Sequence, residues 1–254
     1  MIERNHISIV LVEPAHPANI GAAARAMKNM GFHLLRLVRP ADHLCEDARR
    51  MAMGSQEILE HARVYPTLGR ALSDLHVTVG CTARKGKERV KTMGPEALAG
   101  HLGGGPPDAR IGIVFGREDS GLTNRELDLC NILLAIPTAP EHSSLNLAQA
   151  VLVVCYELMK ARPAPPPSAT APTTLSASSQ ELEELYQQAR EVLLRIGFLD
   201  PANPDRILRV LRRTFGKVGL DPREVRILKG ILRQMNWYAG ISDAAREEDP
   251  ERNR

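Results

Sequence analysis

Short runs of apolar residues recur along the first part of the chain, and segments with helical periodicity separate them. The runs cover residues 7–12, 33–38, 77–82, 111–115 and 132–136. Runs of this length are typical of buried strands. Because strands and helices alternate, the pattern predicts an α/β fold whose parallel sheet is covered by helices on both faces. Ligands of such sheets bind in the loops at the carboxyl ends of the strands.

Capping signals indicate where the helices between these strands begin and end. Gly31 is a typical C-terminal stop for a helix that ends at Met30. The predicted N-terminal caps are Asn19, Thr123 in a capping box with Glu126, and Ser143 or Ser144 for the long helix that follows.

A segment rich in proline, alanine, serine and threonine divides the chain. It extends from residue 161 to residue 180 with a single charge, at Arg162, so it is not expected to form a core. The predicted organisation is an α/β domain over residues 1–162, a linker over 163–177 and a small α-helical C-terminal extension over 178–254. The helices of this extension are expected to begin near Ser178, Asp205 and Asp221. Such a short unit is expected to pack on a neighbour or a partner chain.

The composition narrows the class of protein. Of the 254 residues, 43% are hydrophobic and 25% are charged, as in ordinary globular proteins. No apolar run reaches the roughly 18 residues that a membrane-spanning helix needs, and no signal-peptide pattern precedes the first strand, so we expect a cytoplasmic protein. The four cysteines lie far apart and no histidine stands at zinc-finger spacing, so neither disulfides nor a structural metal are expected.

The charges are unevenly distributed, although the formal net charge is only +3. Five basic residues fall between Arg84 and Lys91 against Glu88 alone, and nine fall between Arg206 and Arg233. Phosphate groups are the obvious ligands for such clusters, and a solvated helix face or loop is the alternative interpretation.

Polar residues gather in two loops that follow predicted strands. Asn19 and Arg25 stand six residues apart in N-I-G-A-A-A-R-A-M, which is expected to point them in broadly similar directions. The small residues between them would let a nucleotide come close, although tight helix packing explains them as well. F-G-R-E-D-S-G-L-T, residues 115–123, lies between a strand and a helix but is neither a dinucleotide-binding nor a Walker sequence. A plain surface turn is the alternative for this loop.

A third cluster of polar residues stands where the last helix of the domain begins. The sequence I-P-T is followed there by S-S-L-N-L-A-Q-A, with Ser143, Ser144 and Asn146 close together. Serine caps explain only part of this cluster. His16 and His142 are conceivable bases, although single loop histidines are more often uninvolved in chemistry.

Together and in this order, the three motifs resemble those of the SPOUT (trefoil-knot) RNA methyltransferases. The chain looks most similar to bacterial tRNA (cytidine/uridine-2′-O)-methyltransferases of the TrmJ type, because D-R-I-L-R-V-L-R-R and V-R-I-L-K-G-I-L-R-Q resemble their helical extension. The resemblance covers nearly the whole chain outside the linker and the final dozen residues. It implies an α/β sheet whose C-terminal part forms a deep trefoil knot, S-adenosylmethionine bound in that knot, and a homodimer with the site at its interface.

The resemblance also assigns roles to individual residues. The family's catalytic positions are occupied by Arg25, Asn19, Glu118, Ser144 and Asn146. Its cofactor-binding positions are occupied by Cys81, Thr82, Ala83, Gly116, Ile136, Ser143, Ser144 and Leu145. The residues expected to contact RNA are Arg84, Lys85, Lys87, Arg117, Arg212 and Arg213.

The implied reaction is in-line attack of a ribose 2′-oxygen on the sulfonium methyl group, for which positioning supplies much of the acceleration. Because a guanidinium is effectively always protonated, we expect Arg25 to grip an RNA phosphate and orient the 2′-hydroxyl. A phosphate oxygen or water would then accept the proton. With nine aromatic residues in the chain, phosphate contacts are expected to outweigh base stacking in RNA binding.

The resemblance therefore implies a homodimeric, S-adenosylmethionine-dependent 2′-O-methyltransferase that acts on a pyrimidine of the tRNA anticodon loop, at nucleotide 32. A ribosomal RNA 2′-O-methyltransferase would carry the same three motifs, and the C-terminal extension favours tRNA. A non-catalytic RNA-binding protein is a further alternative. The joint presence of all five residues at catalytic positions argues against it.

Overall fold

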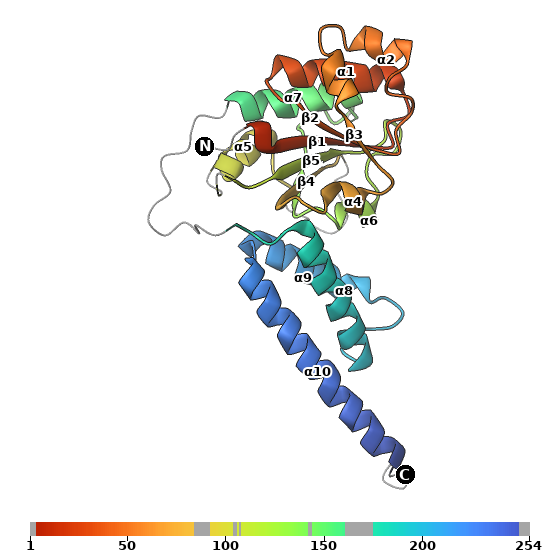
Figure 1. The fold of residues 1–254 in the computed structure, drawn as a ribbon, viewed down its shortest axis with the longest axis vertical. Helices are drawn as coiled ribbons and strands as arrows, with labels where there is room; N and C mark the ends of the chain where they lie inside the picture. The colour runs from red at the N-terminus through yellow and green to blue at the C-terminus, as the bar shows by residue number, and fades with distance from the viewer. Residues whose placement is uncertain are drawn as a thin grey trace. The chain divides into compact units, whose positions relative to one another are not determined.

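The computed structural model describes residues 4–83, 92–103, 106, 108–141, 144–160 and 175–248. It divides into two compact units, Met1–Ser179 and Gln180–Arg254. The first unit is α/β and the second is helical, which confirms the predicted fold class (Figure 1). Most of the predicted linker lies outside the described residues, and the trefoil knot stays a prediction.

Six parallel strands form the sheet, in the order β3-β2-β1-β5-β4-β6. The strands are β1 Ile7–Val12, β2 Leu34–Val38, β3 Arg63–Tyr65, β4 Val77–Cys81, β5 Ile111–Phe115 and β6 Ile132–Leu134. All five predicted strands are confirmed, with small shifts of their ends. β3 was not predicted, because three residues at a sheet edge carry too little pattern to identify a strand.

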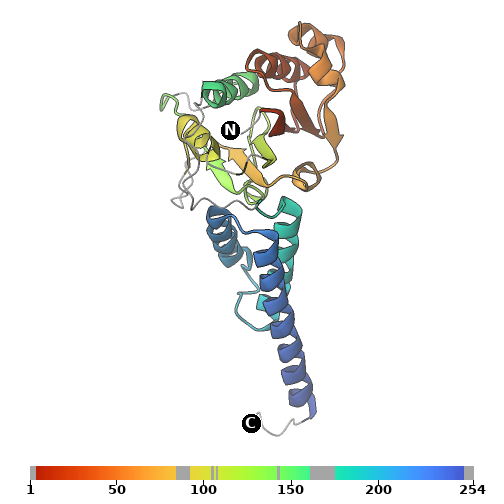
Figure 2. The ribbon, with the colours of Figure 1, turned by 60° about the vertical axis from the view of Figure 1, so that its left-hand side comes forward.

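The sheet is covered on both faces because both faces of its strands are apolar. In β1, Ile9 and Leu11 point to one hydrophobic core while Val10 and Val12 point to the other. Figures 1 and 2 show the sheet between its helices, with α1, α2 and α7 on one side and α4 and α6 on the other. The helices of this unit are η1 Arg4–His6, α1 Pro17–Asn29, α2 Glu46–Met51, α3 Gln56–Glu60, α4 Leu68–Leu72, α5 Pro95–Gly103, α6 Asn124–Leu127 and α7 Leu147–Lys160.

The helix starts differ from the predicted caps at two functional positions. α1 begins at Pro17 with His16 as its N-cap, so the prediction that Asn19 caps it is wrong. Proline suits the first helical position, and this start leaves the Asn19 side chain free for a longer-range contact. α7 is capped by Asn146, whose Oδ1 accepts a hydrogen bond from the backbone N–H of Ala148 at 2.9 Å, so Ser144 is not its cap. The other predicted cap, Ser143, lies outside the described residues.

The predicted capping box at the start of α6 is confirmed. The side chain of Thr123 accepts a hydrogen bond from the backbone N–H of Glu126, and the Glu126 side chain accepts one from the backbone N–H of Thr123. These reciprocal bonds satisfy two backbone donors that the helix would otherwise leave unpaired.

The C-terminal unit contains α8 Ser179–Arg195, α9 Asp205–Val218 and α10 Pro222–Glu248. These starts lie within one residue of the predicted ones. Tyr186 is buried in this unit, where its ring stacks on Phe215 at 6.4 Å and under the guanidinium of Arg212 at 4.3 Å. Arg212 also donates to both carboxylate oxygens of Glu183, at 2.6 and 2.8 Å. Arg212 therefore stabilises the interior of the helical unit.

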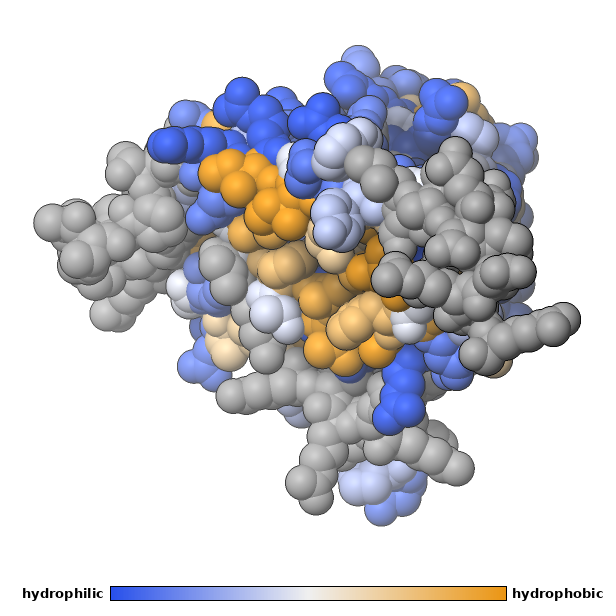
Figure 3. All heavy atoms as spheres, turned by 90° about the horizontal axis from the view of Figure 1, so that it is seen from below, coloured by the Kyte–Doolittle hydropathy of each residue, from blue (hydrophilic) through white to orange (hydrophobic). Residues whose placement is uncertain are grey.

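Several large apolar side chains of the C-terminal unit stay exposed. More than half of the surface is exposed for Phe198, Val210, Ile227, Ile231, Trp237 and Tyr238. Figure 3 shows apolar residues gathered in one area of the face that it views, with hydrophilic residues around them. Apolar surface of this kind is typical of a region that makes further contacts.

The cysteines are free thiols. Within the parts of the chain that the structure describes, no helix is both long and apolar enough to cross a membrane. In the same parts, no three His, Cys, Asp or Glu side chains are grouped so that they could hold a metal ion.

α1 and α2 touch each other at Gly21. A Cβ atom built on Gly21 would lie 2.1 Å from the carbonyl oxygen of Ala48 in α2. Backbone cannot move out of the way as the end of a flexible side chain can. Gly21, one of the small residues of the first motif, thus serves tight helix packing. This agrees with the packing interpretation of that motif.

We predict that Gly21→Ala destabilises the protein by about 1–3 kcal/mol, because the added methyl group forces α1 and α2 apart. The matched control is Gly69→Ala in α4, where no atom lies within 4 Å of the added Cβ. That variant is expected to be as stable as the wild type or up to about 1 kcal/mol more stable, because alanine favours helix. Urea unfolding followed by circular dichroism checks both, and an unchanged midpoint for Gly21→Ala would contradict the close contact.

Candidate active site

A cavity of about 250 Å³ lies at the carboxyl ends of β4, β5 and β6. Its wall comes from the loop after β4, the loop after β5, and the segment that connects β6 to α7. Seven of the predicted cofactor-binding residues line it, namely Cys81, Thr82, Ala83, Gly116, Ile136, Ser144 and Leu145. The eighth, Ser143, lies outside the described residues. Parallel strands bring these loops together because their carboxyl ends meet at one edge of the sheet.

Sequence reasoning missed several residues of the cavity wall. They are Asp119, Ser120, Leu122, Thr138, Leu147 and Ala150. All of them stand within or beside the three motifs, so the motif loops as whole segments were the signal that could have found them.

The loop after β5 is a tight turn that admits no side chain at residue 116. A Cβ atom built on Gly116 would lie 2.1 Å from the carbonyl carbon of Gly121. The turn is closed by a hydrogen bond of 2.9 Å from the N–H of Gly121 to the carbonyl oxygen of Arg117, and Gly121 has a φ of +68° that favours glycine. Glycine at position 116 is therefore required by the packing of the turn on itself, and Gly116 also lines the cavity.

The wall combines neutral and charged groups. Burial raises the pKa of the Cys81 thiol to about 12, so this side chain stays uncharged. Ile136 and Leu145 add apolar surface, while Glu118 and Asp119 place carboxylates at the loop after β5. Apolar walls with a few convergent polar groups are typical of small-molecule and cofactor sites, and they suit a nucleoside-like group with a charged tail.

A chain of hydrogen bonds joins all three motifs beside this cavity. The Glu118 carboxylate accepts bonds from the backbone N–H groups of Ala15 and His16, at 2.9 and 3.2 Å, and from the Asn19 side-chain amide at 3.0 Å. Asn19 in turn accepts a bond of 2.9 Å from the side-chain amide of Asn146. Asn146 caps α7, so the chain runs from the start of α1 through the loop after β5 to the start of α7.

The electrostatics of Glu118 follow from these donors. Burial acts to raise the pKa of its carboxyl, but the hydrogen bonds from Asn19, Ala15 and His16 outweigh burial and hold the pKa below its ordinary value. The group is therefore ionised near neutral pH and acts as an acceptor. As arranged here, it orients the first motif and does not store a proton.

The structure does not place Arg25 on the cavity wall. Arg25 is exposed on α1, and it makes no hydrogen bond or ion pair with any residue that the structure describes. Asn19 faces Glu118 instead, so the expectation that Asn19 and Arg25 point in similar directions is wrong. Ser144 lines the cavity, whereas Asn19 and Asn146 are connected to it through Glu118.

The residues predicted to contact RNA fall into three groups. Arg84, Lys85 and Lys87 lie outside the described residues. Arg117 and Arg212 are held by carboxylates of the protein itself. Arg213 is partly exposed and has no ion pair with any described residue. Contact with RNA stays a prediction for all of them.

Comparisons with known proteins identify the family. Residues 6–156 match the family model of the SpoU rRNA Methylase family, and residues 180–250 match that of the tRNA methyltransferase TrmJ, C-terminal domain. The chain belongs to the SpoU methylase family, which confirms the resemblance found in its sequence.

Individual relatives resemble the chain over most of its length. It is 38% identical to the tRNA (cytidine/uridine/adenosine-2′-O-)-methyltransferase TrmJ of Pseudomonas aeruginosa, an alignment that covers 98% of this chain and 100% of the relative. It is 36% identical to the tRNA (cytidine/uridine-2′-O-)-methyltransferase TrmJ of Pectobacterium atrosepticum, over 90% and 95% of the two chains. Among solved structures, TrmJ from Z. mobilis ZM4 is 34% identical with a TM-score of 0.77, and the match covers 90% of this chain and 98% of that one.

We predict that Glu118→Gln destabilises the protein by about 1 kcal/mol at pH 7, because the amide presents N–H groups to donors that need an acceptor. The ionised carboxylate stabilises the fold above the pKa of the unfolded chain, about 4.3, and this contribution is lost as the pH falls toward the lower folded-state value. The difference between wild type and variant should therefore shrink below about pH 4.3.

Thermal unfolding at pH 7 and pH 4 measures this difference. The control is Asp119→Asn, because Asp119 is exposed and its hydrogen bonds with described residues stay within its own loop, so little change is expected. A Glu118→Gln variant as stable as the wild type at pH 7 would show that the carboxylate does not hold the first motif.

Proposed function

We propose that this protein is an S-adenosylmethionine-dependent 2′-O-methyltransferase for a pyrimidine ribose in the tRNA anticodon loop, at nucleotide 32, and that it acts as a cytoplasmic homodimer. The observation that carries the proposal is the cavity that the three motif loops form, with its wall of predicted cofactor residues. The names of the similar proteins support tRNA as the substrate and the 2′-oxygen as the methylated atom. The nucleotide position depends on the sequence resemblance.

The cavity residues suit this cofactor. Backbone at Gly116 and Ala83 can approach a nucleoside closely, while the Ile136 and Leu145 side chains supply the apolar surface that a base needs. When bound, S-adenosylmethionine supplies the methyl group. Among the described wall residues, the Glu118 and Asp119 carboxylates would attract its positively charged groups.

Arg25 is proposed to hold the RNA. Its guanidinium is exposed and unpaired among the described residues, so it is available to bind a phosphate next to the target ribose and to orient the 2′-hydroxyl. Because Arg25 does not line the cavity of its own chain, a second copy of the chain would complete the site. This arrangement supports the homodimer.

The first experiment incubates the purified protein with tritiated S-adenosylmethionine and bulk tRNA transcribed without modifications, and then maps the labelled nucleotide. We expect label in a 2′-O-methylated pyrimidine of the anticodon loop. Label in ribosomal RNA and not in tRNA would overturn the substrate class. Failure to bind S-adenosylmethionine in calorimetry would favour a non-catalytic RNA-binding protein.

We predict that Arg25→Ala lowers methyl transfer by at least about 100-fold, because the ribose is no longer positioned, while cofactor affinity is unchanged. Arg25→Lys should recover only part of the activity, since an ammonium group lacks the fork geometry of a guanidinium. The control is Lys28→Ala, which removes a positive charge one turn further along α1 and should keep most of the activity. Near-full activity of Arg25→Lys would contradict the need for a guanidinium.

The helical unit is proposed to bind tRNA through its free basic residues. We predict that Arg213→Ala weakens tRNA binding and lowers the slope of log affinity against log salt by about one, because one phosphate contact is lost. Arg212→Ala should instead lower the melting temperature, since Arg212 is paired with Glu183 and stacked on Tyr186. Fluorescence anisotropy with labelled tRNA over a salt series checks the first prediction, and an unchanged slope for Arg213→Ala would contradict it.

A further inference from the structure

Two residues at neighbouring strand ends have a backbone conformation that is rare for their types. Glu13 follows β1 with a φ of +48°, and Arg39 follows β2 with a φ of +44°. Val12 and Val38 are paired in register, so the two residues stand side by side. Positive φ in residues other than glycine persists only where the surroundings fix it, and such positions cluster at functional sites.

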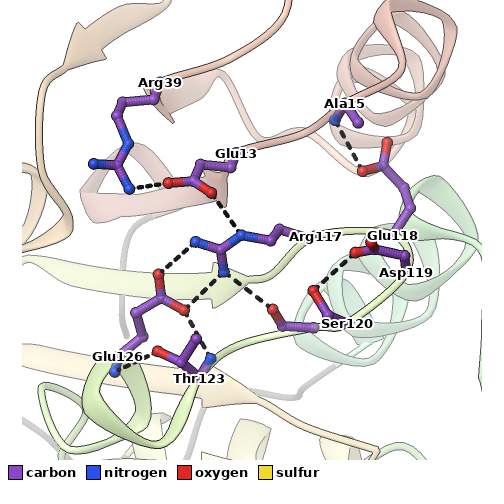
Figure 4. A network of polar contacts seen from close by, with 10 residues as sticks. Glu13, Ala15, Arg39, Arg117, Glu118, Asp119, Ser120, Thr123 and Glu126 are labelled. Atoms are coloured by element: carbon purple, nitrogen blue, oxygen red, sulfur yellow. Dashed lines mark hydrogen bonds and ion pairs between the residues drawn. The ribbon is translucent and has the colours of Figure 1, made fainter.

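Glu13 forms an ion pair with Arg117 from the loop after β5. Arg117 donates a hydrogen bond from Nε to Glu13 Oε2 at 2.6 Å, and the other oxygen of Glu13 pairs with Arg39. From its opposite edge, Arg117 donates to both oxygens of Glu126, each at 3.0 Å. Figure 4 shows the Arg117 guanidinium between the two carboxylates, while the next side chain, Glu118, points the other way toward Ala15. Only 20% of the Arg117 side chain is exposed.

These contacts fix the turn at several points. The backbone oxygen of Arg117 accepts the hydrogen bond from Gly121 that closes the turn, and Nη1 of Arg117 lies 3.4 Å from the carbonyl oxygen of Gly121. Glu126 belongs to the capping box of α6, so it is itself held by Thr123. The turn is thereby tied to the end of β1 on one side and to the start of α6 on the other. Its residues 116–121 line the cavity.

The charges around Arg117 argue against a phosphate contact. The four side chains of Arg39, Glu13, Arg117 and Glu126 carry two positive and two negative formal charges, which cancel. Asp119, in the same loop, adds a further carboxylate. A guanidinium whose two edges are occupied by carboxylates offers little to an RNA backbone.

We propose that Arg117 is a positioning residue of the cofactor site: held between Glu13 and Glu126, it keeps the turn of residues 116–121 in the shape that the cofactor meets. Arg117 thus sets the affinity for the cofactor and not the affinity for RNA. This inference depends on the proposed function, because it takes S-adenosylmethionine as the ligand of the cavity.

The test measures the dissociation constant for S-adenosylmethionine by calorimetry, together with tRNA affinity and melting temperature, for the full chain. Arg117→Ala is expected to weaken cofactor binding about tenfold or more, and Arg117→Lys to restore part of it, because lysine keeps the charge but not the fork. Affinity for tRNA should stay within about twofold of the wild type. The matched control is Arg125→Ala, which removes an exposed arginine of α6 that has no partner among the described residues and should leave both affinities unchanged.

A double-substitution cycle tests whether Arg117 acts through Glu13. Glu13→Gln alone should weaken cofactor binding, whereas in the Arg117→Ala background it should add little, because the interaction is already lost. Glu13→Gln and Arg117→Lys keep side-chain volume, so they also provide the answer if Arg117→Ala does not fold. Fully additive effects of Glu13→Gln and Arg117→Ala would overturn the proposed route through Glu13.

Other outcomes would overturn the inference as a whole. Weaker tRNA binding with unchanged cofactor affinity would show that Arg117 contacts RNA. A lower melting temperature with an unchanged cofactor dissociation constant in the folded fraction would show that Arg117 stabilises the fold only. A wild-type protein that does not bind S-adenosylmethionine would refute the proposed function itself, and this result is recognised before any substitution is made.

Discussion

The arrangement of the site depends on two consecutive side chains that point in opposite directions. They are Arg117 and Glu118 in the loop after β5, which point apart in Figure 4. Glu118 holds the start of α1, and through Asn19 it also reaches the start of α7. Arg117 holds the end of β1 and the start of α6. Arg117 and Glu118, two adjacent residues of opposite charge, therefore hold four segments around the cavity.

Several arginines are paired with carboxylates of the protein itself, and this distinguishes them from arginines that could bind a partner. Arg36 is buried in the sheet and donates to Asp74 and Ser8, and the pKa of Asp74 is lowered mainly by its hydrogen bond to Arg36. Arg212 is likewise bound bidentately by Glu183, and Arg117 is bound bidentately by Glu126 with Glu13 at its other edge. Counting basic residues along the sequence therefore overestimates the surface that RNA can use, because a bidentate carboxylate occupies the fork that would bind a phosphate.

The family resemblance identified about half of the cavity wall. Local patterns were enough to predict five of the six strands and the Thr123 capping box, because burial, capping and strand ends are encoded by neighbouring residues. They were not enough for the ion pairs of Glu13 and Glu126 with Arg117. Glu13 and Arg117 are 104 positions apart, and no pattern near Glu13 in the sequence predicts its partner. The prediction that Asn19 caps α1 was wrong for the same reason, since the Asn19 side chain bonds to Glu118, 99 positions away. Long-range polar pairs depend on the register of the sheet, which brings β1 beside β5.

The geometry of α1 also explains why Arg25 and Asn19 cannot share one cavity. With 3.6 residues per turn, six residues correspond to about 1.7 turns, so the two side chains diverge by roughly 120°. Asn19 faces Glu118 within its own chain, while Ile20, Ala23 and Ala24 are fully buried in the core. Arg25 is consequently turned to the outside of the unit. An arginine in that position is available to a molecule that approaches from outside, as the proposed binding of RNA across two copies of the chain requires.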